Sequence, residues 1–181
     1  MDGTWDAVVL AGGRGSRLGE VDKAAVVVGG TPLLARALAA VAGAGRVVVV
    51  GPRRPWVSAP RVVWAREEPP GGGPLAGLAA GLASVVADRV VVLAVDQPWV
   101  TAATVERLLA VGGDAVLVDE RGRPQWLTGA WSVPRLRAAL PADPAGASMR
   151  SLLGPLDATP VPAQGGEARD VDTPADLRDT P

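Results

Sequence analysis

The 181-residue chain contains no cysteine, no histidine, no phenylalanine and no tyrosine. Without cysteine, it can form no disulfide and offers neither a thiolate metal ligand nor a thiol nucleophile. Without histidine, it lacks the commonest general base and the commonest zinc ligand. Any chemistry must therefore depend on carboxylates, hydroxyls, lysine and arginine, together with a cation that prefers oxygen ligands.

The chain also lacks a charge imbalance and a long apolar run. Its formal net charge is −1, so no overall basic field favours nucleic acid or an anionic membrane, and any anion site must be local. The N-terminal residues 1–6 lack the basic start and apolar run of a signal peptide. No apolar run reaches the length of a membrane span. We therefore expect a cytoplasmic protein that binds neither nucleic acid nor a membrane.

What the chain does contain is valine, leucine and alanine in short blocks, with six tryptophans as its only aromatic residues. Continuous apolar runs predict strands that are covered on both faces, as in a parallel sheet. These runs are residues 7–11, 46–50, 61–65, 89–95 and 115–118.

Helical patterns separate these strands. Thr31 and Pro32 are expected to be the N-cap and first-turn proline of a helix that continues to about Ala42. Further helices are predicted over residues 75–87 and 101–110, and Thr173-Pro174 starts a short C-terminal one. The alternation predicts an α/β fold, a three-layer sandwich with a Rossmann-like, mostly parallel sheet flanked by helices.

The pattern loosens from Gln125 onward. We expect a strand over residues 125–131, short helices over 134–140 and 148–153, and loops at the prolines between and after them. The whole of residues 1–181 is predicted to be one domain. In it, residues 1–120 form the nucleotide-binding half and residues 121–181 the acceptor-binding half.

The most informative stretch runs from Val8 to Lys23. An apolar strand leads into a loop with four glycines, two arginines and a serine, and the loop ends on a lysine. Glycines allow backbone N–H groups to approach a ligand closely, and the basic side chains add positive charge, which suits a polyphosphate. The spacing is that of neither a P-loop nor a dinucleotide-binding fingerprint, because Asp22 precedes Lys23 and Leu18 replaces the third glycine.

The loop and its flanks resemble the signature of the nucleotidyltransferase superfamily, and within it the molybdenum cofactor guanylyltransferase family. The matching blocks follow the order of that family and span most of the chain: residues 10–13, 17–19, 21–23, 73–77, 96–98 and 172–177. The resemblance implies Mg²⁺-dependent transfer of GMP from GTP to the molybdopterin cofactor, with release of pyrophosphate. It also implies transient contact with other proteins of the molybdenum cofactor pathway.

The same resemblance assigns the site residues. Lys23, Arg17 and Asp96 are the expected catalytic residues. Lys23 and Arg17 would bind phosphate, although a lysine considered alone is most often a solvated surface residue. The expected nucleotide-binding residues are Leu10, Ala11, Gly12, Gly13, Lys23, Gly51, Glu68, Gly73 and Asp96.

Asp96 follows a buried strand, and ligands of open α/β sheets bind beyond such strand ends. A carboxylate there can hold Mg²⁺ against a triphosphate, or it can form a local turn before Pro98. Asp172 is the expected second metal ligand, with Asp170 as the alternative; Asp172 could also cap the last helix. Two departures from the family concern the base and the acceptor: Asp172 stands where many guanylyltransferases have asparagine, and Gly51 where the family places an asparagine near the base.

Trp126 and Trp131 could stack on a flat acceptor or simply fill a core without phenylalanine and tyrosine. Arg150 could bind an acceptor phosphate or lie in solvent. Two other functions also stay open. One is transfer to another acceptor or from CTP, as in a molybdopterin cytidylyltransferase, although the cytidylyl relatives tend to have alanine at the position of Gly12. The other is a non-catalytic nucleotide-binding regulator.

Overall fold

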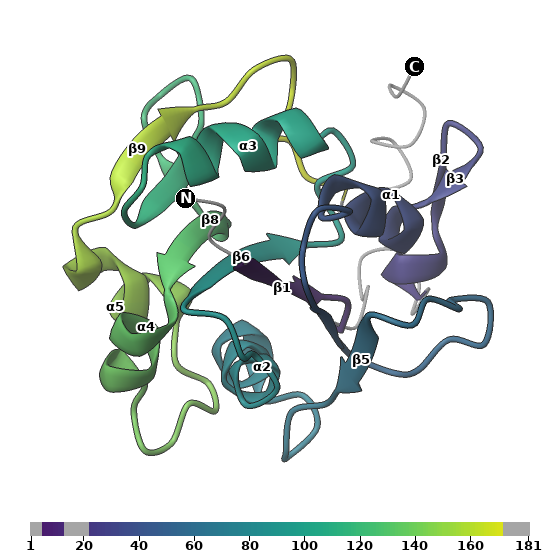
Figure 1. Cartoon of the computed structure of the whole chain (residues 1–181), viewed down its shortest axis with the longest axis horizontal. Helices are drawn as coiled ribbons and strands as arrows, with labels where there is room; N and C mark the ends of the chain where they lie inside the picture. The colour runs from purple at the N-terminus through teal and green to yellow at the C-terminus, as the bar shows by residue number, and fades with distance from the viewer. Residues whose placement is uncertain (1–4, 13–21, 172–181) are drawn as a thin grey trace.

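The computed structural model describes residues 5–12 and 22–171, and these contain a seven-stranded sheet in the order β5–β4–β1–β6–β8–β7–β9 (Figure 1). β8 is antiparallel to both of its neighbours, whereas all other adjacent pairs are parallel. The mostly parallel sheet expected from the sequence is therefore confirmed. The strands are β1 (Trp5–Leu10), β4 (Val47–Val50), β5 (Val62–Ala65), β6 (Arg89–Ala94), β7 (Ala115–Val118), β8 (Pro124–Ser132) and β9 (Thr159–Pro162).

Helices cover both faces of this sheet, as Figure 1 shows. α1 (Leu33–Ala40) and α3 (Ala102–Ala110) pack on one face, together with Ala7 and Val9 of β1. α2 (Gly73–Leu82), α4 (Val133–Ala139) and α5 (Met149–Leu153) pack on the other, together with Val8 and Leu10. Alternate residues of each strand point to opposite faces, so each strand contributes to both core layers. The first layer is built from valine, leucine and alanine, and the second mainly from valine and leucine.

The expected start of α1 is wrong by one residue, because Pro32 is the N-cap and Leu33 the first helical residue. Thr31–Pro32 forms a short strand, β3, which pairs antiparallel with β2 (Val27–Val28). The turn between them consists of Gly29 and Gly30, whose φ angles are 55° and 77°. Two glycines with positive φ make the tight turn that joins antiparallel strands, so the hairpin displaces the helix start past Pro32.

α2 ends at Leu82, five residues before its predicted end. The backbone N–H groups of Val86 and Ala87 donate instead to Oδ2 of Asp6, at 2.8 and 3.1 Å. Asp6 is buried, and its Oδ1 also accepts from the N–H of Arg46. A buried carboxylate thus takes the donors that a longer helix would use, and no local pattern reveals this.

β9 replaces a predicted loop. It pairs only with β7, at the edge of the sheet. Pro160 and Pro162 alternate with Thr159, whose N–H donates to Asp114 O, and with the buried Val161. Proline is tolerated in an edge strand because its missing N–H is not needed on the open side. Proline content alone therefore gave the wrong secondary structure here.

The feature that positions the site is the edge of the sheet formed by the C-terminal ends of β5, β4, β1 and β6. The N–H of Ala11 donates to Val50 O, that of Gly51 to Ala65 O, and that of Val95 to Leu10 O, at 2.8, 2.9 and 3.2 Å. These bonds continue the sheet past the strand ends and hold the segments that follow side by side. Residues far apart in sequence thereby share one edge.

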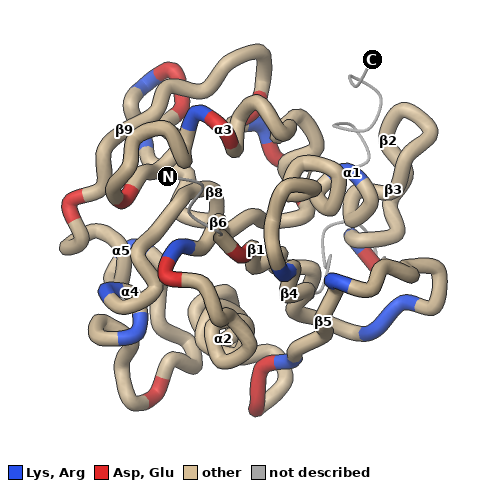
Figure 2. The backbone as a smooth tube through the Cα atoms, viewed as in Figure 1, with Lys and Arg blue, Asp and Glu red and all other residues tan. Residues whose placement is uncertain are grey.

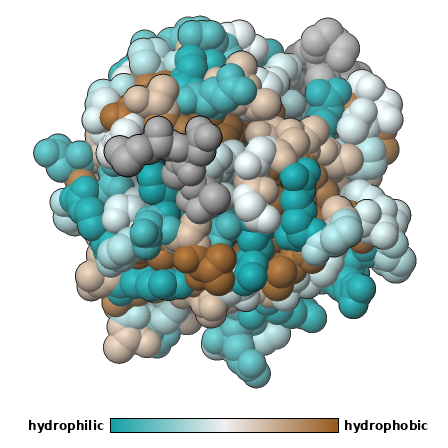
Figure 3. Space-filling model, viewed as in Figure 1, coloured by the Kyte–Doolittle hydropathy of each residue, from teal (hydrophilic) through white to brown (hydrophobic). Residues whose placement is uncertain are grey.

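The exterior is mixed in character. Acidic and basic residues lie on all sides of the molecule (Figure 2), and hydrophobic groups on the visible face of Figure 3 are small and separated by hydrophilic ones. Within the described part of the chain, no helix has the length and hydrophobicity needed to cross a membrane.

Candidate active site

Lys23 and Asp96 meet at this edge, although they are 73 positions apart in sequence. Lys23 Nζ lies 3.4 Å from Asp96 Oδ2, and the two side chains are 18% and 26% exposed. The pair is thus partly shielded but open to a ligand. In such a pair the cation can bind a polyphosphate, and the anion can bind the metal ion that accompanies it.

Lys23 opens a short 3-10 turn, η2 (Lys23–Ala25), whose N-cap is Asp22. Asp22 Oδ1 accepts from the N–H of Ala24 at 3.2 Å, which fixes the start of the turn. Lys23 is also the only lysine among the chain's 18 lysine and arginine residues. That single exception was a signal in the sequence that the motif analysis above did not use.

Gly51, Ala11 and Gly12 lie in direct backbone contact. Gly51 has a φ of +146°, and a Cβ there would lie 3.0 Å from three backbone atoms of Ala11 and Gly12. Only glycine allows this approach. The structure therefore gives a reason why no asparagine stands at this position: its side chain has no room.

The two acidic residues after β5 differ in placement. Glu67 Oε1 accepts from the N–H of Gly71 at 3.2 Å and lies 3.9 Å from the position that a Cβ on Gly12 would take. Glu68 is exposed. Of the two, Glu67 rather than the expected Glu68 has its carboxylate close to Gly12.

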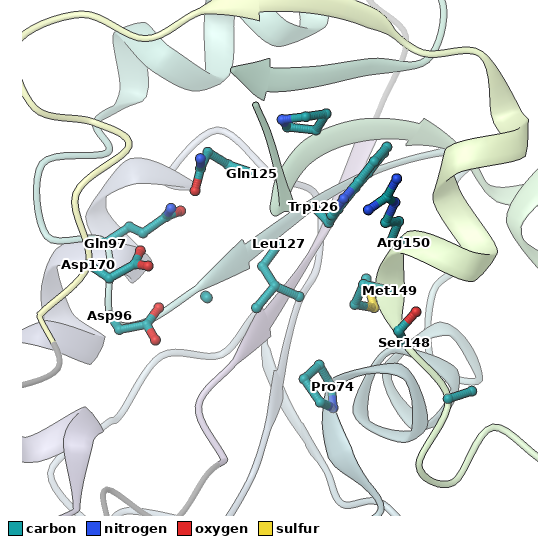
Figure 4. Close-up of a pocket in the computed structure, with 13 residues that line it drawn as sticks. Pro74, Asp96, Gln97, Gln125, Trp126, Leu127, Ser148, Met149, Arg150 and Asp170 are labelled. Carbon is teal, nitrogen blue, oxygen red and sulfur yellow. The ribbon is translucent and has the colours of Figure 1, made fainter. Parts of the chain in front are cut away.

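An open cleft of about 490 Å³ extends from Asp96 into the second half of the chain. In Figure 4, Asp96, Asp170 and Gln97 lie on one side of it, and Trp126, Met149 and Arg150 on the other. Pro74, directly after Gly73, forms part of the lower wall. The Thr128 hydroxyl donates to the side-chain carbonyl of the buried Gln97, which joins β8 to the segment after β6.

The candidate tryptophans separate into two roles. Trp126 lines the cleft, whereas Trp131 is completely buried in the core. Both pack with the core layer of α2, α4 and α5, but Trp126 lies at the margin of that layer and is only partly buried. Trp131 therefore cannot stack on an acceptor, and only Trp126 keeps that possibility.

Asp170 reaches the site through the segment after β9. The N–H of Val171 donates to the carbonyl of Asp96 at 2.8 Å, and Asp170 lines the cleft beside Asp96 (Figure 4). Arg169 lies over the ring of Trp99, 4.9 Å from its centroid. Among residues 5–12 and 22–171 there is no cluster of three acidic, histidine or cysteine side chains that could hold a metal by itself. Gly13, Arg17 and Asp172 lie outside the described residues.

The same segment is tied to α3 by Glu167. Its carboxylate accepts from the Thr104 hydroxyl at 2.6 Å, from Arg107 Nη2 at 2.5 Å and from the N–H of Gln164 at 2.8 Å. Burial raises the pKa of Glu167, but these hydrogen bonds outweigh it and the pKa is lowered on balance. Glu167 is therefore a charged anchor for the segment that carries Asp170.

Comparison with known proteins agrees with this geometry. The family model of the MobA-like NTP transferase domain matches residues 7–160. A molybdenum cofactor guanylyltransferase of Rhodobacter capsulatus is 34% identical over 182 residues, covering 94% of this chain and 91% of that protein. One of Xanthomonas euvesicatoria is 44% identical over 109 residues, covering 59% of this chain and 54% of that protein.

Solved structures share the fold. A nucleotidyl transferase from Methanothermobacter superposes with a TM-score of 0.74 at 25% identity, covering 96% of this chain and 94% of that one. The molybdopterin-guanine dinucleotide biosynthesis protein A of Archaeoglobus fulgidus superposes with a TM-score of 0.70 at 22% identity, covering 96% and 95%.

Proposed function

The chain belongs to the MobA-like NTP transferase family, and on that premise we propose that it transfers GMP from GTP to the molybdopterin cofactor. In this reaction an oxygen of the acceptor's terminal phosphate attacks the α-phosphorus of GTP, a new phosphoanhydride bond forms, and pyrophosphate leaves. The acceptor phosphate is already anionic, so the reaction needs no strong general base. That requirement suits a chain without histidine.

The observation that carries the proposal is the Lys23–Asp96 pair, of which Asp96 lines the cleft. Lys23 Nζ lies 3.4 Å from Asp96 Oδ2, and its proposed role is to neutralise charge on the α-phosphate and the departing pyrophosphate. Arg17 is proposed as a second phosphate contact. Catalysis by such a site depends on positioning and on charge stabilisation rather than on covalent chemistry.

Enzymes of this family need a divalent metal ion, and we propose Mg²⁺. The carboxylates fit it, because Mg²⁺ prefers oxygen ligands and is usually held by one or two carboxylates together with substrate phosphates. Asp96 would be one ligand, and Asp172 or the neighbouring Asp170 the second. When bound, the ion would offset part of the negative charge of the substrate phosphates.

The two halves of the chain would then divide the substrates. Residues 1–120 provide the proposed nucleotide contacts: Leu10, Ala11, Gly12, Gly13, Lys23, Gly51, Gly73, Asp96 and an acidic residue after β5. Residues 121–181 provide Trp126 and Arg150, which face Asp96 across the cleft and suit a flat, phosphate-bearing acceptor. Proteins that make or receive the cofactor would be transient partners.

The test is pyrophosphate release with Mg²⁺ and molybdopterin, measured with GTP, CTP, ATP and UTP in turn. We expect GTP to give the highest kcat/KM. Asp96→Asn should lower kcat/KM with GTP by about a hundredfold or more, since it removes a charge that acts on the transferring phosphate. Asp88→Asn is the matched control, because Asp88 is exposed at the opposite end of the same strand, β6.

Three outcomes would overturn the proposal in different ways. A preference for CTP would replace guanylyl by cytidylyl transfer. Transfer with GTP to another phosphate acceptor, but not to molybdopterin, would change the acceptor. Binding of GTP without pyrophosphate release would leave a nucleotide-binding regulator.

A further inference from the structure

Arg54 is a buried cation that takes no part in the chemistry described above. It lies in the connection between β4 and β5, and its side chain is 7% exposed. Its guanidinium donates to oxygen atoms of Asp22, Pro52 and Ala11. Nε donates to Asp22 Oδ2 at 2.8 Å and Nη2 donates to Asp22 Oδ1 at 2.5 Å.

The guanidinium also reaches two backbone carbonyls. Nη1 donates to Pro52 O at 2.6 Å, and Nη2 lies 3.4 Å from Ala11 O. Arg54 therefore connects three segments: the end of β1, the start of the β4–β5 connection, and the residue directly before Lys23. These are the segments that border the proposed phosphate site.

The carboxylate of Asp22 passes this constraint on to Lys23. Arg54 binds both carboxylate oxygens of Asp22. The same carboxylate caps the 3-10 turn whose first residue is Lys23. With the residue before it and the turn after it both fixed, Lys23 has little freedom except in its own side chain. That side chain ends 3.4 Å from Asp96.

The chemistry of the Arg54–Asp22 pair favours a persistent ion pair. A guanidinium stays protonated at every relevant pH and presents paired donors that match a carboxylate. The hydrogen bond from Arg54 keeps the pKa of Asp22 below its ordinary value of 3.8, against the raising effect of burial. Both partners therefore stay charged throughout the neutral pH range.

We infer that Arg54 is a positioning residue for Lys23: through Asp22 it sets the place of the lysine ammonium relative to Asp96 without touching the substrate. The inference rests on the proposed function, in which Lys23 acts on the transferring phosphate. Its consequence is that loss of Arg54 is felt through Lys23. A misplacement of about 1 Å in a catalytic group can cost on the order of a hundredfold in rate.

A double-mutant cycle tests this link. The variants are Arg54→Gln, Lys23→Ala and the two combined, each assayed for kcat and for the KM of GTP. We expect Arg54→Gln to lower kcat about tenfold or more with the KM for GTP changed no more than about threefold. In the Lys23→Ala background, the same substitution should cause no further loss, because the group that it positions is gone.

Two further variants keep the test decisive. Asp22→Asn retains an acceptor for the N–H of Ala24 but removes the charge that Arg54 holds, so it should behave like Arg54→Gln even if that variant folds poorly. Arg46→Gln is the matched control: Arg46 precedes the opposite end of β4, and its Nη1 donates to Ser84 O at 2.8 Å. It should leave kcat within about twofold of wild type.

Lys23 is the only lysine in the sequence, so labelling lysine with ¹³C at Cε gives a single NMR signal. This signal is present in every variant that retains Lys23. We expect this signal to shift in Arg54→Gln and Asp22→Asn and to stay unchanged in Arg46→Gln. Equal kcat losses from Arg54→Gln in both lysine backgrounds, or an unshifted lysine signal, would overturn the inference. A wild-type protein without transfer activity would instead overturn the proposed function, and the lysine signal would still decide the role of Arg54.

Discussion

Replacing Gly51 by alanine should damage both the fold and the nucleotide site, and the structure separates the two contributions. At a φ of +146°, an L-residue is strained, which costs on the order of 1–3 kcal/mol. The new Cβ would also lie 3.0 Å from the backbone of Ala11 and Gly12, which cannot move without disturbing β1. We expect a total loss of about 3 kcal/mol in unfolding free energy.

For a domain of this size, such a loss lowers Tm by roughly 6–12 °C. Gly112→Ala is the matched control. Gly112 also has a positive φ, +79°, but nothing lies within 4 Å of its would-be Cβ. It therefore measures backbone strain alone and should cost about 1–2 kcal/mol.

The assay is thermal and urea unfolding, followed by circular dichroism, with and without GTP and Mg²⁺. A ligand that binds only the folded state raises Tm, so the increase caused by GTP reports binding. Gly51→Ala should lose most of that increase because Ala11 and Gly12 are displaced, whereas Gly112→Ala should keep it. Equal destabilisation in both variants, with the GTP-induced increase intact in both, would refute this reasoning.

Three further predictions concern the acidic residues after β5, the buried carboxylate of Glu167, and the two tryptophans of β8. Glu67→Gln should raise the KM for GTP about tenfold and Glu68→Gln at most about twofold, because the carboxylate of Glu67 is close to Gly12 whereas Glu68 is exposed. Steady-state kinetics that show the reverse would assign the role to Glu68. The pKa of Glu167 is lowered in the fold, so its contribution to stability is complete above its ordinary pKa of 4.5 and is lost as the pH falls through the lower folded value. Urea unfolding between pH 6 and 3 should therefore show a shallower acid loss for Glu167→Gln than for wild type, and parallel curves would contradict it. Trp131→Ala should cost about 3–5 kcal/mol in unfolding free energy. Trp126→Ala should cost less, because that side chain is only partly buried, and should raise the KM for the acceptor; the opposite pattern would exchange their roles.

Much of the fold could be predicted because its strands are continuous apolar runs. The predicted strands ending at Val50, Ala65 and Val118 end at those residues in the structure, since hydrophobic periodicity is a local signal. The hairpin before α1 was missed although its signal, the Gly29–Gly30 pair, is local. The early end of α2 and the edge strand β9 could not be predicted, because they depend on the carboxylate of Asp6 and on pairing with β7, which are tertiary interactions.

Part of the candidate site could likewise be predicted from the sequence, and part could not. Lys23 and Asp96 were predicted by motif and by position after a strand, and the structure brings them together. Arg54 was missed because nothing near it in sequence marks it as different from the exposed Arg53. Its burial and its bond to Asp22, 32 positions away, exist only in the folded chain. The proximity of Glu67 to Gly12 likewise exists only in the folded chain.

The most direct test of the account is the rate of pyrophosphate release from GTP, with Mg²⁺ and molybdopterin, in wild type and in Lys23→Ala. The account predicts a fall in kcat of about a hundredfold to a thousandfold, because the charge that stabilises the transferring phosphate is removed. It also predicts that GTP still raises the Tm of the variant, since the glycine-lined edge at Gly12 and Gly51 is intact. An unchanged kcat would contradict it.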